Sequence, residues 1–137
     1  MTFPVTEVSG QLHKAGQVVL DSAGNGVLTF DPASARDRWE VTSVVVSTNQ
    51  AATATVVPVA TVAKNTAIVA QLGQGNNRGQ SWSGNQDTFA GQVDISAADY
   101  LSVLFSPPPG ATAGQIATLA GVIGYATVTG TRYTRRA

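Results

Sequence analysis

The stretch that decides the fold is Arg38-Trp-Glu-Val-Thr-Ser-Val-Val-Val-Ser-Thr48. It contains no glycine or proline and is rich in β-branched side chains, which is typical of a central β-strand rather than a helix. Because side chains alternate along a strand, the spacing predicts its two faces. One face carries Trp39, Val41 and Val45, and the other carries Val44 and Val46. Both faces are therefore expected to be partly apolar, one over the domain core and the other covered by a further element or another subunit.

Similar segments recur on both sides of this strand, separated by turn signals and without a convincing helix. They lie at residues 17–21, 26–31, 51–63, 66–72, 92–96, 100–105 and 117–132. Short strands at intervals of about 8 to 12 residues are typical of sandwiches and small barrels. The sequence therefore predicts an all-β protein, an antiparallel β-sandwich of the jelly-roll type, with an immunoglobulin-like sandwich as the alternative.

Local signals refine this prediction. Asn25-Gly26 favours a tight hairpin between residues 17–21 and 26–31. Pro58 cannot donate a ladder hydrogen bond, so the segment around it is expected at a sheet edge or at a bulge. Residues 73–91 are rich in glycine and asparagine and predict a long surface loop with one short strand near residues 80–83.

The length of 137 residues suits one domain with a real hydrophobic core. We expect an extended N-terminal arm at residues 1–15, a sandwich at 16–132 and a basic tail at 133–137. The opening residues lack a basic region followed by an apolar run, so no secretory signal is predicted. The sequence contains no run of about 18 apolar residues, so no membrane-spanning segment is predicted.

Charge and cysteine content exclude several classes of function. Eight basic and eight acidic residues cancel, so there is no overall field to attract nucleic acid or anionic lipid, and neither partner is expected. The chain has no cysteine, hence no disulfide framework or thiolate metal site. Charged residues make up only 12% of the chain, and such a surface favours association. A homo-oligomer is therefore expected, with a trimer as the leading candidate.

Catalytic chemistry finds little support in the residues. His13 is the single histidine and lies in the expected arm, away from any nucleophile pattern. A zinc site needs three or four His, Cys or carboxylate ligands, and no such set stands out in the sequence. Glycoside hydrolysis needs two carboxyl groups that converge across a cleft, whereas Asp87, Asp94 and Asp99 occupy ordinary turn or outward strand positions. We expect no enzyme activity, no metal and no cofactor, and a small-molecule ligand is not expected either.

A role in binding has more support from the residues than a catalytic role. Trp82, beside Asn85, Gln86 and Asp87, combines an aromatic platform with amide and carboxylate groups, as in sugar recognition. The same residues also describe a solvated loop whose aromatic packs on the sandwich rim. Phe89 is either presented to a partner or caps the edge of the core.

Several motifs together resemble a known kind of protein. They are Gly26-Val-Leu-Thr-Phe-Asp-Pro32, Arg38 to Thr48, Trp82-Ser-Gly-Asn-Gln-Asp-Thr88, Asp99-Tyr-Leu-Ser-Val-Leu-Phe105, Pro109-Gly-Ala-Thr-Ala113 and Ala126-Thr-Val-Thr-Gly130. In these motifs, residues 16–132 resemble small β-sandwich virion structural proteins of actinobacterial tailed phages. Residues 117–125 depart from that pattern, being longer and more apolar, and Phe105-Ser106 stands where a Trp-Thr pair is commoner.

The resemblance implies a decoration or cement protein on the outer surface of a capsid, with a major capsid protein of the HK97-type fold as its partner, assembled in the host cytoplasm. The alternative it allows is a tail or head-fibre component that binds carbohydrate for host attachment. We expect contacts through the arm, residues 82–89, residues 107–110 and the tail. The candidate contact residues are Phe3, Pro4, His13, Trp82, Asn85, Asp87, Phe89, Pro108, Arg135 and Arg136.

Overall fold

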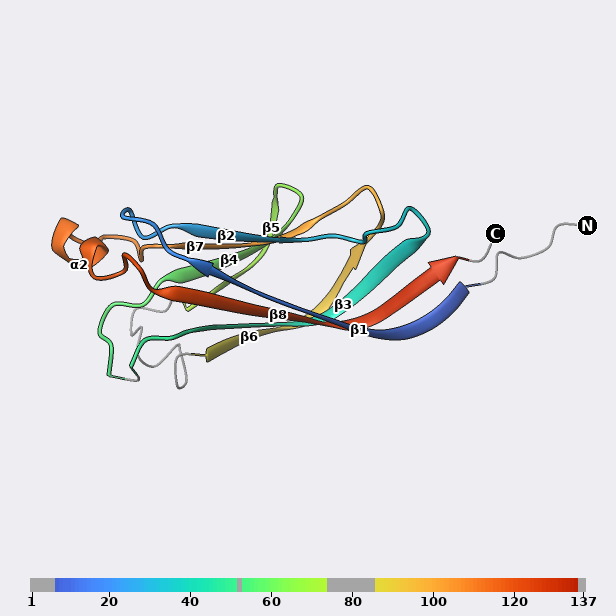
Figure 1. Ribbon diagram of the computed structural model, residues 1–137, viewed down its shortest axis with the longest axis horizontal. Helices are drawn as coiled ribbons and strands as arrows, with labels where there is room; N and C mark the ends of the chain where they lie inside the picture. Colours follow the sequence, from blue (N-terminus) through green and yellow to red (C-terminus); the bar gives the residue numbers. More distant parts are fainter. Residues whose placement is uncertain (1–6, 52, 74–85, 136–137) are drawn as a thin grey trace, which may run out of the picture.

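The computed structural model describes residues 7–51, 53–73 and 86–135, which form two antiparallel four-stranded sheets packed face to face (Figure 1). The first sheet has the order β1 (Glu7–Val19), β8 (Ile123–Arg135), β3 (Asp37–Thr48) and β6 (Gln86–Ile95). The second has the order β2 (Gly26–Phe30), β7 (Leu101–Ser106), β4 (Val59–Lys64) and β5 (Ala67–Leu72). The predicted antiparallel β-sandwich is confirmed.

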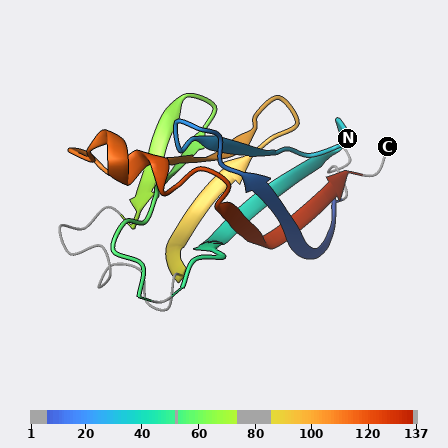
Figure 2. The same cartoon turned by 60° about the vertical axis from the view of Figure 1, so that its left-hand side comes forward.

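The two ends of the sandwich differ. The short helix α2 (Ala113–Ala117) stands at one end, whereas β1 begins and β8 ends at the other (Figure 1). Figure 2 shows the long strands β6, β3 and β8 side by side, in the order that their pairing gives. Helix α2 was not predicted from the sequence, although Thr112-x-x-Gln115 is a capping-box pattern.

Strand β3 lies inside the first sheet, as predicted, but its faces differ from the simple alternation. Both of its pairings shift register between Val41 and Ser43, which marks a β-bulge. The extra residue turns Val44 and Val46 to the same side as Trp39 and Val41, and all four are buried. Val45 points outward and is half-buried. The expectation of two apolar faces is therefore wrong, because the bulge gathers these side chains into one core.

Gly130 makes the bulge possible on the neighbouring strand β8. A Cβ atom at this position would collide with the backbone oxygen of Glu40. Only glycine lets the two backbones approach so closely.

The predicted hairpin after β1 is also wrong, because the two segments belong to different sheets. β1 pairs along its whole length with β8, and β2 pairs with β7. The turn is nevertheless tight: one carboxylate oxygen of Asp21 accepts the backbone N–H groups of Ala23 and Asn25, and Gly24 has a φ of 78°. This turn carries the chain across the core from one layer to the other.

Period-two alternation in residues 92–96 and 100–105 predicts that Val93, Ile95, Leu101, Val103 and Phe105 point inward, and the structure places all five in the core. Leu101, Val103 and Phe105 on β7 have no exposed surface, and Val93 and Ile95 on β6 are also buried. The Phe105 ring lies against Gly124, where a Cβ atom would be only 2.8 Å from the ring.

Several expected boundaries moved. Strand β1 runs without a break across the expected boundary between residues 15 and 16, so residues 7–15 of the expected arm are paired sheet.

Pro58 directly precedes β4, an interior strand, so its missing N–H costs the ladder nothing and the edge prediction is wrong. β6 starts at Gln86 inside the expected loop, and the short strand expected near residues 80–83 lies outside the described residues. The last strand starts at Ile123, after α2, rather than near residue 117.

Candidate interface

Five of the ten candidate contact residues lie in the described part of the chain. Phe3, Pro4, Trp82, Asn85 and Arg136 lie outside it. The structure does not bring the other five into one site: His13 lies along the edge strand β1, Asp87, Phe89 and Pro108 belong to segments at or toward the α2 end, and Arg135 lies at the opposite end.

His13 is exposed on β1, directly opposite Thr129 of β8. Within residues 7–51, 53–73 and 86–135, no group of three or more His, Asp or Glu residues is placed to hold a metal ion.

Asp87 ties the two sheets together where β5 ends and β6 begins. Its Oδ2 accepts the backbone N–H of Gly73 at 2.8 Å, and its Oδ1 accepts the backbone N–H of Thr88 at 2.8 Å. Both carboxylate oxygens therefore already serve the fold, which weakens the case for Asp87 as a sugar ligand.

Phe89 packs at the edge of the core from strand β6. It lies opposite Val44 on β3, and a Cβ atom at Gly91 would be only 2.8 Å from its ring. In the structure Phe89 closes the rim of the sandwich, which is the second of the two interpretations that the sequence left open.

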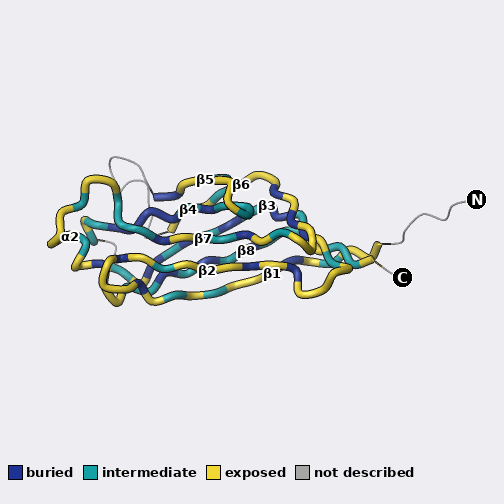
Figure 3. The backbone as a smooth tube through the Cα atoms, turned by 90° about the horizontal axis from the view of Figure 1, so that it is seen from above, coloured by how far each residue is buried: buried dark blue, intermediate teal, exposed yellow. Residues whose placement is uncertain are grey.

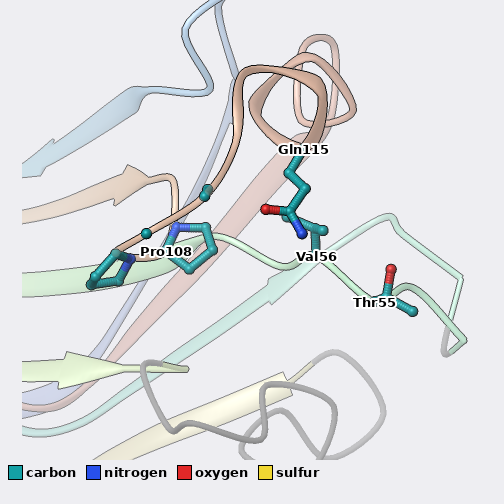
Figure 4. Close-up of a pocket in the computed structure, with 7 residues that line it drawn as sticks. Thr55, Val56, Pro108 and Gln115 are labelled. Carbon is teal, nitrogen blue, oxygen red and sulfur yellow. The ribbon is translucent and has the colours of Figure 1, made fainter.

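Pro108 borders a shallow hollow of about 220 Å³ at the α2 end (Figure 4). The other wall is the segment with Thr55 and Val56, and Gln115 of α2 reaches toward it (Figure 4). Thr55 and Val56 also line a second hollow, which has a volume of about 360 Å³.

The cap of α2 fixes the position of Gln115 beside these hollows. Thr112 Oγ1 accepts the backbone N–H of Gln115 at 3.2 Å, and Gln115 Oε1 accepts that of Thr112 at 2.8 Å. On the other wall, Gln50 Nε2 donates to the backbone oxygen of Val56 at 2.8 Å. No sequence signal marks Thr55 and Val56, whereas the capping-box pattern could have identified Gln115.

Arg135 borders a third hollow, of about 330 Å³, at the end away from α2. Its backbone N–H donates to the backbone oxygen of Arg36 at 2.9 Å, which places the two arginines together. Arg38 binds Glu7 through two hydrogen bonds of 2.9 and 3.1 Å and lies 4.0 Å over the ring of Tyr133. The hydrogen bond from Arg38 lowers the pKa of Glu7, and in return Glu7 raises the pKa of Arg38.

No described helix is long and apolar enough to span a lipid bilayer. The two ends of the sandwich carry hollows with different linings. One end has hollows lined by Pro, Thr, Gln and Val, and the other has an arginine-rich hollow.

Neither a family model nor a curated protein sequence matches the chain. Among solved structures, it is similar to a chain of the acidic stable capsid structure of Helicobacter pylori bacteriophage KHP30, with a TM-score of 0.52 and 11% identity over 96% of this chain and 93% of that one. It is also similar to FLHE, with a TM-score of 0.48 and 17% identity over 93% and 98% of the two chains. A chain of the infectious bursal disease virus Gx strain gives a TM-score of 0.40 and 10% identity, and the match spans 32% of that chain. At such identities the likeness concerns the fold, and the first match shows that this fold also occurs as a chain of comparable extent in a phage capsid.

Proposed function

We propose that this chain is a non-enzymatic structural protein of a phage virion, a decoration protein that binds the exterior of the capsid shell. The observation that carries the proposal is the likeness to a chain of the KHP30 capsid over nearly the full length of both chains. The low content of charged residues supports it, since a protein that lives packed against neighbours has little use for a charged surface.

We further infer that the sandwich is a jelly roll. The strand pairs are nested, β1 with β8, β2 with β7, β3 with β6 and β4 with β5. Folding such a nested ribbon into two layers gives the eight-stranded arrangement found in many viral capsid domains.

In this mechanism the sandwich is a rigid body whose ends contact neighbouring subunits. We propose a major capsid protein of the HK97-type fold as the partner, and many copies of this chain on each particle. A ligand that binds only the assembled lattice shifts the equilibrium toward the intact shell, so each bound copy stabilises the particle. The trimer expected from the sequence remains a prediction.

Adding the purified chain to phage particles that lack it tests this function. We expect saturable binding, a label spread over the capsid surface in electron micrographs, and a higher temperature of particle disassembly. A label confined to the tail, or bound copies that leave the disassembly temperature unchanged, would contradict the decoration role.

Two variants sharpen the same experiment. Deleting residues 1–6 removes Phe3 and Pro4 and leaves β1 whole, whereas deleting residues 1–15 would also remove much of β1. We expect the shorter deletion to lower occupancy on particles. Gln17→Ala, an exposed change outside the expected contact regions, is the control and should bind like the unaltered chain.

A further inference from the structure

The second sheet has an outer face that carries almost no charge. Among the residues of β2, β7, β4 and β5, Lys64 is the single charged one. It lies at the end of β4, and its Nζ is 3.7 Å from Oδ2 of Asp99. Figure 3 looks down on these strands, which lie side by side. We refer to the outward side chains of these four strands as the β2-β7-β4-β5 face.

Aliphatic side chains stand exposed on this face. Val27, Leu104 and Ile68 are 55%, 41% and 63% exposed, three of the six large apolar residues that are exposed in the described part of the chain. Val27 lies directly opposite Leu104, and Leu104 lies opposite Thr61. Ile68 lies opposite Ala63 in the neighbouring row. Val27 and Leu104 therefore form an exposed aliphatic pair, and Ile68 stands apart from it, beyond the uncharged β4 residues Thr61 and Ala63. Exposed aliphatic groups on a sheet face with so little charge are what a surface covered by another protein would carry.

The other sheet presents a different surface. Its outward side chains include Arg38, Glu40 and, directly opposite Glu40, Asp94. The charged side chains of the strands therefore lie almost entirely on one of the two outer faces, and the other outer face is nearly uncharged.

We propose that the β2-β7-β4-β5 face is a contact between two copies of this chain, packed face to face across a twofold axis. A partner surface with charges would lose their hydration here without gaining an opposite charge. The same face on a second copy is free of that cost. The formal net charge of zero also means that two copies do not repel each other as a whole.

The size of the face sets the strength of this contact. Strands of about six residues span roughly 20 Å, and four strands span about 19 Å, which gives about 400 Å² for each copy. Two copies then bury about 800 Å², below the roughly 1,200 Å² of stable protein complexes. The dimer is therefore weak in dilute solution and becomes populated where copies are held close together, as on a common scaffold.

Sedimentation equilibrium of the full chain, without particles, up to about 1 mM tests the contact. We expect a reversible monomer-dimer equilibrium. Leu104→Lys brings two like charges onto the interface and should weaken association at least about tenfold. Gln17→Lys puts the same charge on the exposed face of the other sheet and should associate like the unaltered chain.

A charge swap separates a lost contact from a damaged fold. Leu104→Glu alone should also associate weakly, whereas an equal mixture of the Leu104→Lys and Leu104→Glu chains should form dimers more strongly than either alone. Circular dichroism checks that each variant is folded.

The proposal is overturned if the unaltered chain is monomeric at 1 mM, if it forms trimers, if the two lysine variants behave alike, or if the mixture is no stronger than its components. A monomeric chain whose Leu104→Lys variant loses occupancy on particles would assign this face to the shell instead, and would also overturn it. Because this assay contains no particles, its result is independent of whether the chain decorates a capsid.

Discussion

At the scale of single residues, Gly130 is the position where the close approach of two backbones admits only glycine. The Cβ atom of an alanine would meet the backbone oxygen of Glu40, so the two strands would have to separate at the bulge. We expect Gly130→Ala to lower the free energy of unfolding by about 1–3 kcal/mol, the usual range for overpacking. Urea denaturation measures it. Gly114→Ala is the matched control, since nothing lies within 4 Å of a Cβ there and alanine suits a helix, so its stability should be equal or slightly higher.

Asp99 makes the stability of the fold depend on pH. Hydrogen bonds from Asn65 and from the backbone N–H and hydroxyl of Ser96 lower the pKa of Asp99 to about 2, with a smaller contribution from Lys64. Because its pKa is lower in the folded than in the unfolded chain, Asp99 stabilises the fold above the unfolded value of 3.8. That stabilisation is lost as the pH falls from 3.8 toward about 2.

The corresponding variant is Asp99→Asn. It should be less stable than the unaltered chain at pH 7, and the difference should shrink through this acid range when both are unfolded in urea. Asp31→Asn, in an exposed loop, controls for the loss of one negative charge. A difference that is equally large at pH 7 and pH 2 would argue against this role of Asp99.

At the scale of elements, the bulge in β3 decides which valines form the core. Val44 has no exposed surface, whereas Val45 points outward. We expect Val44→Thr, which buries a hydroxyl without a designed partner, to cost about 1–3 kcal/mol. The same change at Val45 should alter stability by less than about 0.5 kcal/mol, because threonine suits an outward strand position. Denaturation of the two variants in parallel compares them, and equal costs would show that the alternation of the simple strand holds after all.

Helix α2 shows how a short element shapes a surface. Five residues cannot form a stable helix alone, so the reciprocal bonds of Thr112 and Gln115 define where it starts. Directly after it, Leu119 is fully buried and anchors the connection to β8. The hollow beside Pro108 and Gln115 therefore depends on a cap and one core residue rather than on helix propensity.

At the scale of the whole molecule, the two sheets and the two ends have different characters. The sheet that holds β3 carries several charged side chains on its outer face, whereas Lys64 is the single charged residue in the strands of the other sheet. The arginine-rich hollow is lined by Glu7 and Arg135, where β1 begins and β8 ends, and the hollow with Thr55 and Val56 is lined also by Gln115 of α2. Figure 1 shows these two parts of the sandwich at opposite ends. A body with several distinct surfaces of this kind suits a protein with several neighbours, which is the role that we propose on a particle.

By itself, the sequence determined the class of fold and the inward positions of two strands. Period-two alternation on β6 and β7 identified Val93, Ile95, Leu101, Val103 and Phe105 correctly, because burial of alternate side chains is a local property of a strand. It also marked Asp87 and Phe89 as notable, but their roles in tying and closing the rim depend on segments far away in the chain.

Only the tertiary structure decided which strands pair, where the bulge falls and which outer face is free of charge. The turn after β1 looks like a hairpin locally, yet pairing with β8, more than 100 residues further along the chain, overrides it. The bulge in β3 needs Gly130 on another strand, and one extra residue reverses every side chain beyond it. Strand pairing and the position of the bulge are set by contacts between distant segments, and the local pattern of one strand does not identify its partner strand.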